Sequence, residues 1–322
     1  MTRRKQRLLI SAGGTATTWH LSSLVREVFP DHFELLVCDI YPPHLVASSR
    51  LAQRCFQVPP VADPGYRAHM LALFAAEGID LYVPLIDADV YEFPSDDPSL
   101  EALGVRSTGA VAASAPLLRN KRVLAEFLDR HGIVVPGRLV EEDLSTRPPD
   151  ERVFVKPEKG FGSRGAGVAT VAAARARLRD EEGLVVQALC RPPEITVEVF
   201  NGTTGVRALC RERLETKEGV CTKARIWWDE ELEALARHLC TVLALPVAFC
   251  FQVLRDDRGR WTVVDLNPRL GAGTALSTAY GWSLASAALA AWGRLDLAPE
   301  DFLRLQPEER HVLRVYSEIV MP

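Results

Sequence analysis

The sequence predicts a doubly wound α/β domain followed by an α+β region rich in antiparallel strands. Two observations carry this prediction. The first hundred residues alternate short apolar runs with amphipathic segments, which is typical of βαβ units around a parallel sheet. From residue 135 onward strand-like runs dominate, and only a few helical patterns interrupt them. With 322 residues, the chain is expected to form two or three packed units.

The elements are expected in a definite order. Apolar runs predict strands at 8–12, 34–40 and 81–86, and a helical pattern covers 67–78. Small residues at 107–118 mark a domain boundary near residue 110, and RNKRVLAEFLDRHGI predicts a helix that stops at Gly132. The later strands are expected at 135–140, 152–157, 183–189, 194–200, 205–215, 247–254 and 261–267, with helical patterns at 172–182, 229–244 and 275–292.

Composition and charge exclude several classes of protein. Hydrophobic residues make up 48% of the chain and charged residues 25%, which excludes disorder, collagen and coiled coil. Thirty-eight Lys and Arg against 42 Asp and Glu leave a net charge of -4, so no nucleic acid or anionic membrane is expected as a partner. The seven cysteines are scattered without a CxxC pair and are expected to be reduced, buried hydrophobes.

Two apolar stretches were candidates for targeting or membrane segments. The run LLISA behind the basic N-terminus is shorter than the core of a signal peptide. The stretch 241–254 is broken by Pro246 and Gln252 and falls short of the roughly 20 residues that span a bilayer. A cytoplasmic location is therefore expected.

A glycine-rich segment, RVFVKPEKGFGSRGAGVA at 152–169, is a candidate phosphate loop. Its glycines let backbone N–H groups approach an anion, and Lys156, Lys159 and Arg164 supply positive charge. It differs from the Walker pattern because it contains no GK[ST]. The alternative is a glycine-rich hairpin with solvated charges, and the segment alone does not decide between the two.

The stretch 247–273 is a candidate metal site. DDRG predicts a turn, and if residues 255 and 260 face each other, Gln252 pairs with residue 263. Asp265 and Asn267 then share the face of Gln252, because side chains alternate along a strand. Carboxylate and amide oxygens are ligands that Mg²⁺ prefers, and Arg269 follows close behind. A register slip of one residue would leave only a polar outer face on an ordinary hairpin.

Two further features lie at predicted strand ends in the first domain. Gly13 and Gly14 follow the first strand and either contact a substrate or only permit tight packing. Asp87 and Asp89 follow LYVPLI, and whether they line an acceptor site stays open.

These motifs, in this order, resemble the ATP-grasp superfamily, in particular its branch related to the large chain of carbamoyl-phosphate synthase. The resemblance rests on Lys121 at the start of a helix, VKPEKGFGSRGAG, VVQALCRPPEITVEVF, RALCRER, FCFQV and VVDLNPRLGAG. It implies an ATP-grasp fold with a doubly wound pre-ATP-grasp domain at 1–110, a small lid subdomain at 111–190 and a large subdomain at 191–322. It covers essentially the whole chain.

The resemblance also implies roles for individual residues. Lys121 and Lys156 match the phosphate-contacting lysines, and the loop 160–167 matches the flexible lid over the phosphates. The remaining matches are adenine contacts at Gln187, Ala188 and Leu189, a ribose acid at Glu194, lid residues Gly162, Ser163, Arg164 and Gly165, a phosphate arginine at Arg211 or Arg213, Mg²⁺ ligands at Gln252, Asp265 and Asn267, and the motif arginine Arg269. Two positions depart from the pattern: Asp265 stands where Glu is usual, and Ala188 where the pattern has Glu.

The resemblance implies an ATP-dependent carboxylate–amine ligase that uses Mg²⁺, with Mn²⁺ as a substitute. A substrate carboxylate would attack the γ-phosphorus to form an acyl phosphate and ADP, and an amine would then displace phosphate. The expected substrates are small carboxylates and amines, in particular amino acids or a peptide. A homodimer is compatible with this reading. The alternatives are an ATP-binding sensor without turnover and carbamate or carbamoyl-phosphate chemistry.

Overall fold

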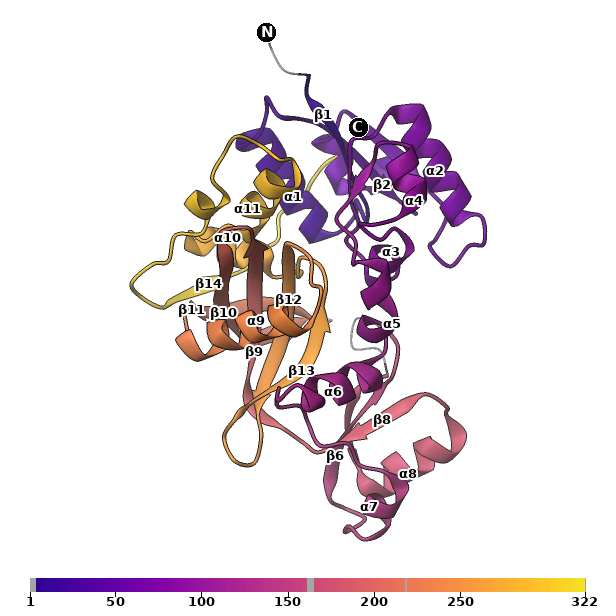
Figure 1. The fold of residues 1–322 in the computed structure, drawn as a ribbon, viewed down its shortest axis with the longest axis vertical. Helices are drawn as coiled ribbons and strands as arrows, with labels where there is room; N and C mark the ends of the chain where they lie inside the picture. The colour runs from indigo at the N-terminus through magenta and orange to yellow at the C-terminus, as the bar shows by residue number, and fades with distance from the viewer. Residues whose placement is uncertain (1–3, 161–164, 218, 322) are drawn as a thin grey trace.

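The computed structural model describes residues 4–160, 165–217 and 219–321, and its three sheets follow one another along the long axis (Figure 1). The first is a five-stranded sheet in the order β3-β2-β1-β4-β5, and all its neighbouring strands are parallel. Its strands are β1 (Gln6–Ile10), β2 (Phe33–Asp39), β3 (Arg54–Gln57), β4 (Leu81–Val83) and β5 (Arg106–Ser107).

Helices cover both faces of this sheet, because alternate strand residues are apolar on both sides. Leu8 and Ile10 of β1 pack with α1 (Ala16–Glu27), whereas Leu9 packs with α2 (Tyr66–Glu77). The remaining elements of this part are η1 (Pro43–Leu45), η2 (Ala47–Arg50), α3 (Asp87–Glu92) and α4 (Pro98–Ala102). The predicted doubly wound domain is confirmed.

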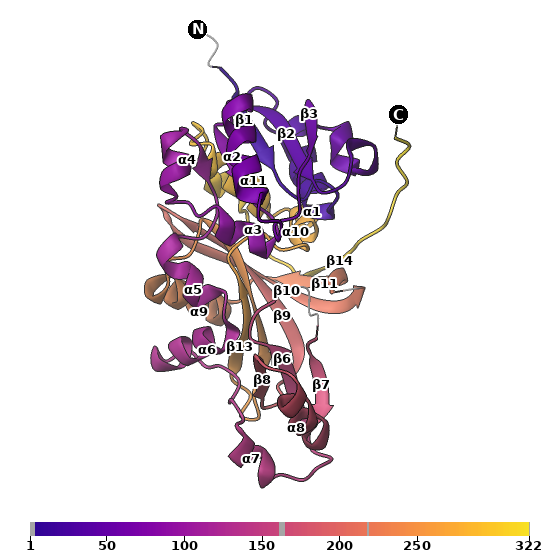
Figure 2. The ribbon, with the colours of Figure 1, turned by 90° about the vertical axis from the view of Figure 1, so that its right-hand side faces the viewer.

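The second sheet is small and lies at the opposite end of the molecule from the first in both views (Figures 1 and 2). Its order is β7-β6-β8, with antiparallel pairing throughout. Its strands are β6 (Arg152–Pro157), β7 (Gly167–Thr170) and β8 (Leu184–Gln187), and the helical elements of this stretch are η3 (Ala112–Ser114), α5 (Ala115–Leu118), α6 (Lys121–Arg130), α7 (Glu141–Ser145) and α8 (Val171–Asp180).

The strand expected at 135–140 does not form. Of this segment, only Arg138 makes an isolated bridge, to Gln187. Pro136 has no N–H for a ladder and Gly137 has no side chain to pack, so the segment stays irregular.

The third sheet is antiparallel and has six strands in the order β13-β12-β9-β10-β11-β14. The strands are β9 (Arg191–Gly202), β10 (Gly205–Lys217), β11 (Val220–Trp227), β12 (Ala248–Arg255), β13 (Trp261–Asn267) and β14 (Arg310–Leu313), and the helical elements are α9 (Glu230–Val242), α10 (Thr274–Tyr280), α11 (Leu284–Trp292) and η4 (Pro299–Phe302). The helix expected at 275–292 is thus two helices, because Gly281 adopts a left-handed conformation with φ of 108° and ends α10.

Helix α11 is buried between the two large sheets. Its alanines 285, 287, 288 and 290 are at most 1% exposed and belong to one apolar core with Leu8 of β1 and Phe200 of β9. Small side chains let the two layers approach closely around this helix. The domain boundaries expected near residues 110 and 190 remain predictions.

The α-helices are short. Among the described residues, none is long and apolar enough to cross a membrane. All seven cysteines are free thiols.

Candidate active site

The hairpin of β12 and β13 brings three oxygen-bearing side chains onto one face, by a register that differs from the expected one. The carboxylate of Asp256 accepts the backbone N–H groups of Arg258 and Arg260 at 3.0 and 2.8 Å, and Arg255 lies opposite Trp261. A bulge then shifts the pairing once more, so Gln252 lies opposite Asp265. The expected pairing of Gln252 with residue 263 is wrong.

The turn and the bulge each shift the strand pairing by one residue. Together they shift it by two residues, so the same side chains stay on the same face of the sheet. Gln252 faces Asp265 directly, and Asn267 shares that face because it lies two residues further along β13. The Nδ2 atom of Asn267 is 3.4 Å from Oδ2 of Asp265. The predicted cluster therefore forms, although its register was wrong.

This donor set suits Mg²⁺ bound together with phosphates. It comprises one carboxylate and two amide oxygens, all half-buried. No group of three or more His, Cys, Asp or Glu side chains that could hold a metal occurs among the described residues. A cation here would need phosphate or water oxygens to complete its coordination. The residues fit a metal that arrives with a polyphosphate.

Lys156 lies next to this cluster. Its side chain extends from β6, is 7% exposed, and donates from Nζ to the carbonyl of Val264 at 2.8 Å. Val264 is the extra residue of the bulge, so its carbonyl is available to the lysine. Burial lowers the pKa of Lys156; the carboxylate of Asp265 opposes this shift, and the charge of Lys121 adds to it.

Lys121 is held beside Lys156 by the start of α6. Asn120 caps this helix by accepting the N–H groups of Arg122 and Val123, at 3.0 and 3.1 Å. The Lys121 backbone donates to the Glu158 carbonyl at 2.8 Å, and its Nζ donates to the Gly160 carbonyl at 2.6 Å. These hydrogen bonds connect the end of β6 to the start of α6. As a result, the side chains of Lys121 and Lys156 line the same cavity.

A narrow cavity of about 20 Å³ joins four of the predicted site residues: Lys121, Lys156, Gln187 and Asp265. They come from α6, β6, β8 and β13, so the cavity lies between the small and the six-stranded sheets. Its remaining walls are apolar, made by Leu124, Ala125, Leu128, Val135, Val263 and Val264. A cavity of this size holds about one water molecule, so the convergence of the polar side chains, and not the volume, marks the place as a candidate site.

The expected adenine segment lies at the end of β8. Gln187 is 2% exposed and lines the cavity. The N–H of Ala188 donates to the Gly137 carbonyl at 2.8 Å and is therefore already engaged. Leu189 is 40% exposed. Of this segment, the cavity is lined by Gln187 alone.

Glu194 and Arg213 pair with each other across β9 and β10. They were expected to contact the ribose and a phosphate, respectively. Arg213 also donates from Nη2 to the Gly219 carbonyl at 2.8 Å. The structure thus brings the two together as an ion pair.

Arg211 lies in the same cross-strand row as Asp265, Gln252 and Thr196. It is 2% exposed and donates from Nη2 to Oε1 of Glu198 at 3.1 Å, and Glu198 is fully buried. Burial by itself would lower the pKa of Arg211, but Glu198 together with the nearby thiols of Cys221 and Cys250 raises that pKa overall. Nε of Arg211 and Oε2 of Glu198 are buried and have no hydrogen-bond partner in the part of the chain that the structure describes.

Arg269 forms a two-point ion pair with Asp87. Its Nε and Nη2 donate to the two carboxylate oxygens at 2.8 and 3.0 Å, although the residues are 182 positions apart. Asp89, by contrast, is fully buried and accepts the hydroxyls of Tyr66 and Tyr82 at 2.7 and 2.5 Å. Of the two aspartates left open, Asp87 reaches the site and Asp89 belongs to the core of the first domain.

The glycine-rich loop is only partly described. Gly162, Ser163 and Arg164 lie outside the described residues. Gly165 has a φ of 71°, and its carbonyl accepts both Nη atoms of Arg177 at 3.3 Å.

Tyr91 and Arg119 also lie at this site, and sequence reasoning missed both. Arg119 lies 5.4 Å from the centre of the Tyr91 ring. Burial and the carboxylates of Asp87 and Asp265 raise the pKa of Tyr91. The spacing of Tyr91 four residues after Asp87 was the available signal, since such residues share a helix face.

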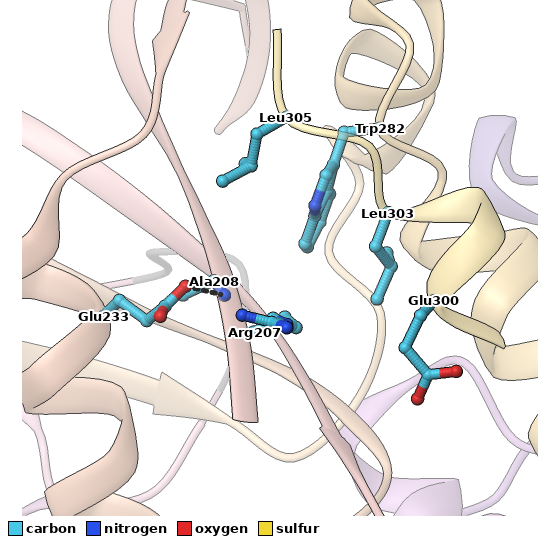
Figure 3. A pocket seen from close by; sticks show the side chains of 7 residues that line it. All are labelled: Arg207, Ala208, Glu233, Trp282, Glu300, Leu303 and Leu305. Carbon is cyan, nitrogen blue, oxygen red and sulfur yellow. Dashed lines mark hydrogen bonds between the residues drawn. The ribbon is translucent and has the colours of Figure 1, made fainter. Parts of the chain in front are cut away.

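A larger cavity of about 270 Å³ lies elsewhere (Figure 3). Its lining residues are Arg207, Ala208, Glu233, Trp282, Glu300, Leu303 and Leu305. The buried carboxylate of Glu233 is already engaged by Trp228 Nε1 at 3.1 Å, by the Ala208 N–H at 3.2 Å and by Arg237. This cavity contains none of the predicted site residues.

Comparison with known proteins identifies the fold. The family model described as the ATP-grasp domain matches residues 118–273. No curated protein sequence matches the chain significantly. Pyruvate carboxylase from Rhizobium etli with acetyl coenzyme A is similar in structure, with a TM-score of 0.74, 15% identity, and coverage of 96% of this chain and 30% of that chain.

Two other similar structures are closer in length. L-amino acid ligase from Bacillus licheniformis has a TM-score of 0.68 and 15% identity, with coverage of 94% of this chain and 78% of that chain. N5-carboxyaminoimidazole synthetase from Staphylococcus aureus, complexed with ADP, has a TM-score of 0.71 and 13% identity, with coverage of 93% and 80%. At these identities the likeness shows the fold alone.

Proposed function

We propose that this chain, which has the ATP-grasp fold and matches the ATP-grasp domain model over residues 118–273, is an ATP-dependent, ADP-forming carboxylate–amine ligase. The observation that carries the proposal is the cavity between the small and the six-stranded sheets, which joins Lys121, Lys156, Gln187 and Asp265. The two lysines and the carboxylate suit the phosphates and the metal of a nucleotide, and the apolar wall suits its base. Because the cavity holds only about one water molecule, the two sheets would have to separate to admit the nucleotide.

Each group has a distinct task in this scheme. Lys121 and Lys156 neutralise phosphate oxygens, and Gln187 with the apolar wall holds the base. Gln252, Asp265 and Asn267 would hold Mg²⁺, which supplies charge neutralisation between neighbouring phosphates. Arg269 and Arg211 supply further positive charge. Asp265 is one methylene shorter than the usual Glu, so its carboxylate reaches less far toward a metal.

The reaction needs positioning and charge rather than a nucleophilic side chain. A substrate carboxylate attacks the γ-phosphorus in line, ADP leaves, and an acyl phosphate results. An amine then attacks the acyl carbon, and phosphate leaves as the amide bond forms. Lysine and arginine residues already in place stabilise the charge that spreads over the transferred phosphoryl group.

Amino acids or a peptide are the proposed substrates. Support comes from the likeness to the structure of L-amino acid ligase from Bacillus licheniformis. A cytoplasmic location, where ATP and amino acids are abundant, accords with this proposal.

Carboxylation is a second candidate. The likeness to pyruvate carboxylase and to N5-carboxyaminoimidazole synthetase favours it. In that case bicarbonate would take the place of the substrate carboxylate at the same phosphoryl-transfer site, and the product would be a carboxylated acceptor.

The test is a turnover screen with ATP, Mg²⁺ and pools of carboxylates and amines, with and without bicarbonate. ADP and phosphate release that requires both a carboxylate and an amine supports the ligase. Release that requires bicarbonate instead supports carboxylation. ATP binding without turnover in any pool would contradict both and favour a sensor.

A matched pair of variants makes the screen specific. Asp265→Asn should abolish turnover while leaving the fold intact, because its side chain faces the site and not the core. Asp257→Asn, an exposed carboxylate in the turn of the same hairpin, should keep the wild-type rate. Equal rates for the two variants would remove the hairpin from the proposed metal site.

A further inference from the structure

We propose that Asp87 is a positioning residue, which holds the guanidinium of Arg269 in place and keeps it away from Asp265. The proposal rests on the proposed function, in which Arg269 and Asp265 serve the phosphates and the metal. It assigns to α3, an element of the first domain, a part in phosphoryl transfer.

The geometry leaves Arg269 with donors to spare. A guanidinium carries five N–H groups in a rigid fork. Asp87 takes those of Nε and Nη2 at 2.8 and 3.0 Å, and the Leu270 carbonyl takes one from Nη1 at 3.1 Å. Two N–H groups remain for an anion. The pair is largely buried, since the side chains of Arg269 and Asp87 are 20% and 16% exposed.

Helix α3 is held by contacts on two sides, which fix the position of Asp87. Asp89 is bound by the hydroxyls of Tyr66 and Tyr82 inside the first domain. Val90 is fully buried in the apolar core that also contains Phe251 and Leu266 of the six-stranded sheet. Asp87 is the first residue of this helix and is therefore fixed against both parts of the molecule.

The ion pair with Asp87 also keeps Arg269 from pairing with Asp265. Asp87 accepts two hydrogen bonds from Arg269, whereas among the described residues no hydrogen bond or ion pair joins Arg269 to Asp265. A buried guanidinium without its partner is costly, so it would turn to another carboxylate, and Asp265 of β13 is only four residues away in the chain. Without Asp87, Arg269 would pair with Asp265 and compete with the metal.

The test compares five variants of the full chain. Asp87→Asn keeps the size of the side chain and removes its charge, and Asp87→Glu restores the charge. Glu92→Gln, on the same helix, removes a carboxylate that faces Arg67 at 3.6 Å, and it is the matched control. Arg269→Lys, alone and combined with Asp87→Asn, completes a double-mutant cycle.

The expected result is specific to positioning. Asp87→Asn should lower kcat on the order of 10-fold and raise the Mg²⁺ concentration for half-maximal rate, because a misplaced charge loses transition-state stabilisation. Asp87→Glu should recover part of the rate, and Glu92→Gln should match the wild type. In the Arg269→Lys background, Asp87→Asn should have no further effect. The proposal would be overturned if the rate losses of Asp87→Asn and Arg269→Lys multiplied in the double variant. It would also be overturned if Asp87→Asn left the Mg²⁺ dependence of the rate unchanged.

A second measurement does not depend on turnover. NMR of protein labelled with ¹⁵N at arginine Nε should show slow exchange of the Arg269 Nε–H in the wild type and in Glu92→Gln, and fast exchange in Asp87→Asn; Arg269→Lys identifies the signal. Wild-type protein without turnover would refute the proposed function and leave this test intact. Turnover with an Arg269 signal that is indifferent to Asp87→Asn would refute the positioning role alone.

Discussion

Lys156 is buried, and among the described residues its Nζ donates to one acceptor, the carbonyl of Val264. We expect Lys156→Ala to weaken the binding of MgADP and to lower the rate, because a charge that meets phosphates acts in both the ground and the transition state. The loss of affinity should be about 10-fold or more. Calorimetry with MgADP measures it, and Lys223→Ala, an exposed lysine paired with Glu215, is the control. Unchanged affinity would count against the assignment.

His20 gives the fold a component that depends on pH. Its Nε2 lies 3.0 Å from Oγ1 of Thr278, so the residue links α1 to α10. Burial, aided by the charge of Arg314, lowers the pKa of His20 from 6.5 to about 4. A lowered histidine pKa means that the neutral ring is favoured in the folded state. The stabilisation is therefore fully present above pH 6.5 and is lost as the pH falls toward 4.

We expect His20→Gln to reduce the loss of unfolding free energy over this pH interval by about 1 kcal/mol, since a half-buried site is partly screened by solvent. Urea unfolding at several pH values measures the effect. His69→Gln, at an exposed position on α2, should leave the pH profile unchanged. A His20→Gln profile that is parallel to the wild type would show that other groups carry the dependence.

At the scale of elements, the segment between β13 and α10 packs on a buried arginine. A Cβ added to Gly273 would lie 2.1 Å from Cζ of Arg211, and this guanidinium is itself enclosed. Gly273→Ala should therefore displace Arg211 from Glu198 and destabilise the fold by about 1–3 kcal/mol. Thermal unfolding measures the change. Gly167→Ala in β7, where a Cβ would meet nothing within 4 Å, is the control and should be tolerated. Equal thermal stability of the two variants would mean that Arg211 can move aside without destabilising the fold.

At the scale of the whole molecule, the cores differ in size. One core joins the five-stranded sheet, α11 and the six-stranded sheet, whereas the small sheet has its own core of seven buried residues. We expect the small sheet to open first, because fewer apolar contacts hold it. Amides of β6 and β8 should exchange at least about tenfold faster than those of β9 and β10. Hydrogen exchange of the native protein tests this, and bound MgADP should reduce the difference. Uniform protection would show a single cooperative unit.

Much of the fold could be predicted because burial leaves a local pattern. Continuous apolar runs separated by amphipathic segments mark the doubly wound domain, and the order of strands after residue 150 follows from the same signal. Failures occurred where local chemistry overrides periodicity: Pro136 prevents the strand expected at 135–140, and Gly281 divides the helix expected at 275–292. Pro136 and Gly281 are both visible in the sequence, so these two errors arose because the apolar pattern was given more weight than the proline and the glycine.

The sequence by itself determined the side-chain chemistry of the candidate site: oxygen donors at Gln252, Asp265 and Asn267, and lysines at 121 and 156. Only the tertiary structure decided how these groups meet. The alignment of Gln252 with Asp265 depends on a five-residue turn and a bulge, two shifts that no alternation of side chains reveals. The pairing of Asp87 with Arg269 spans 182 positions, and residues so distant in the chain are neighbours only after two sheets have packed on α11. Periodicity reports which face of an element is buried, whereas contacts between elements depend on the packing of the whole molecule.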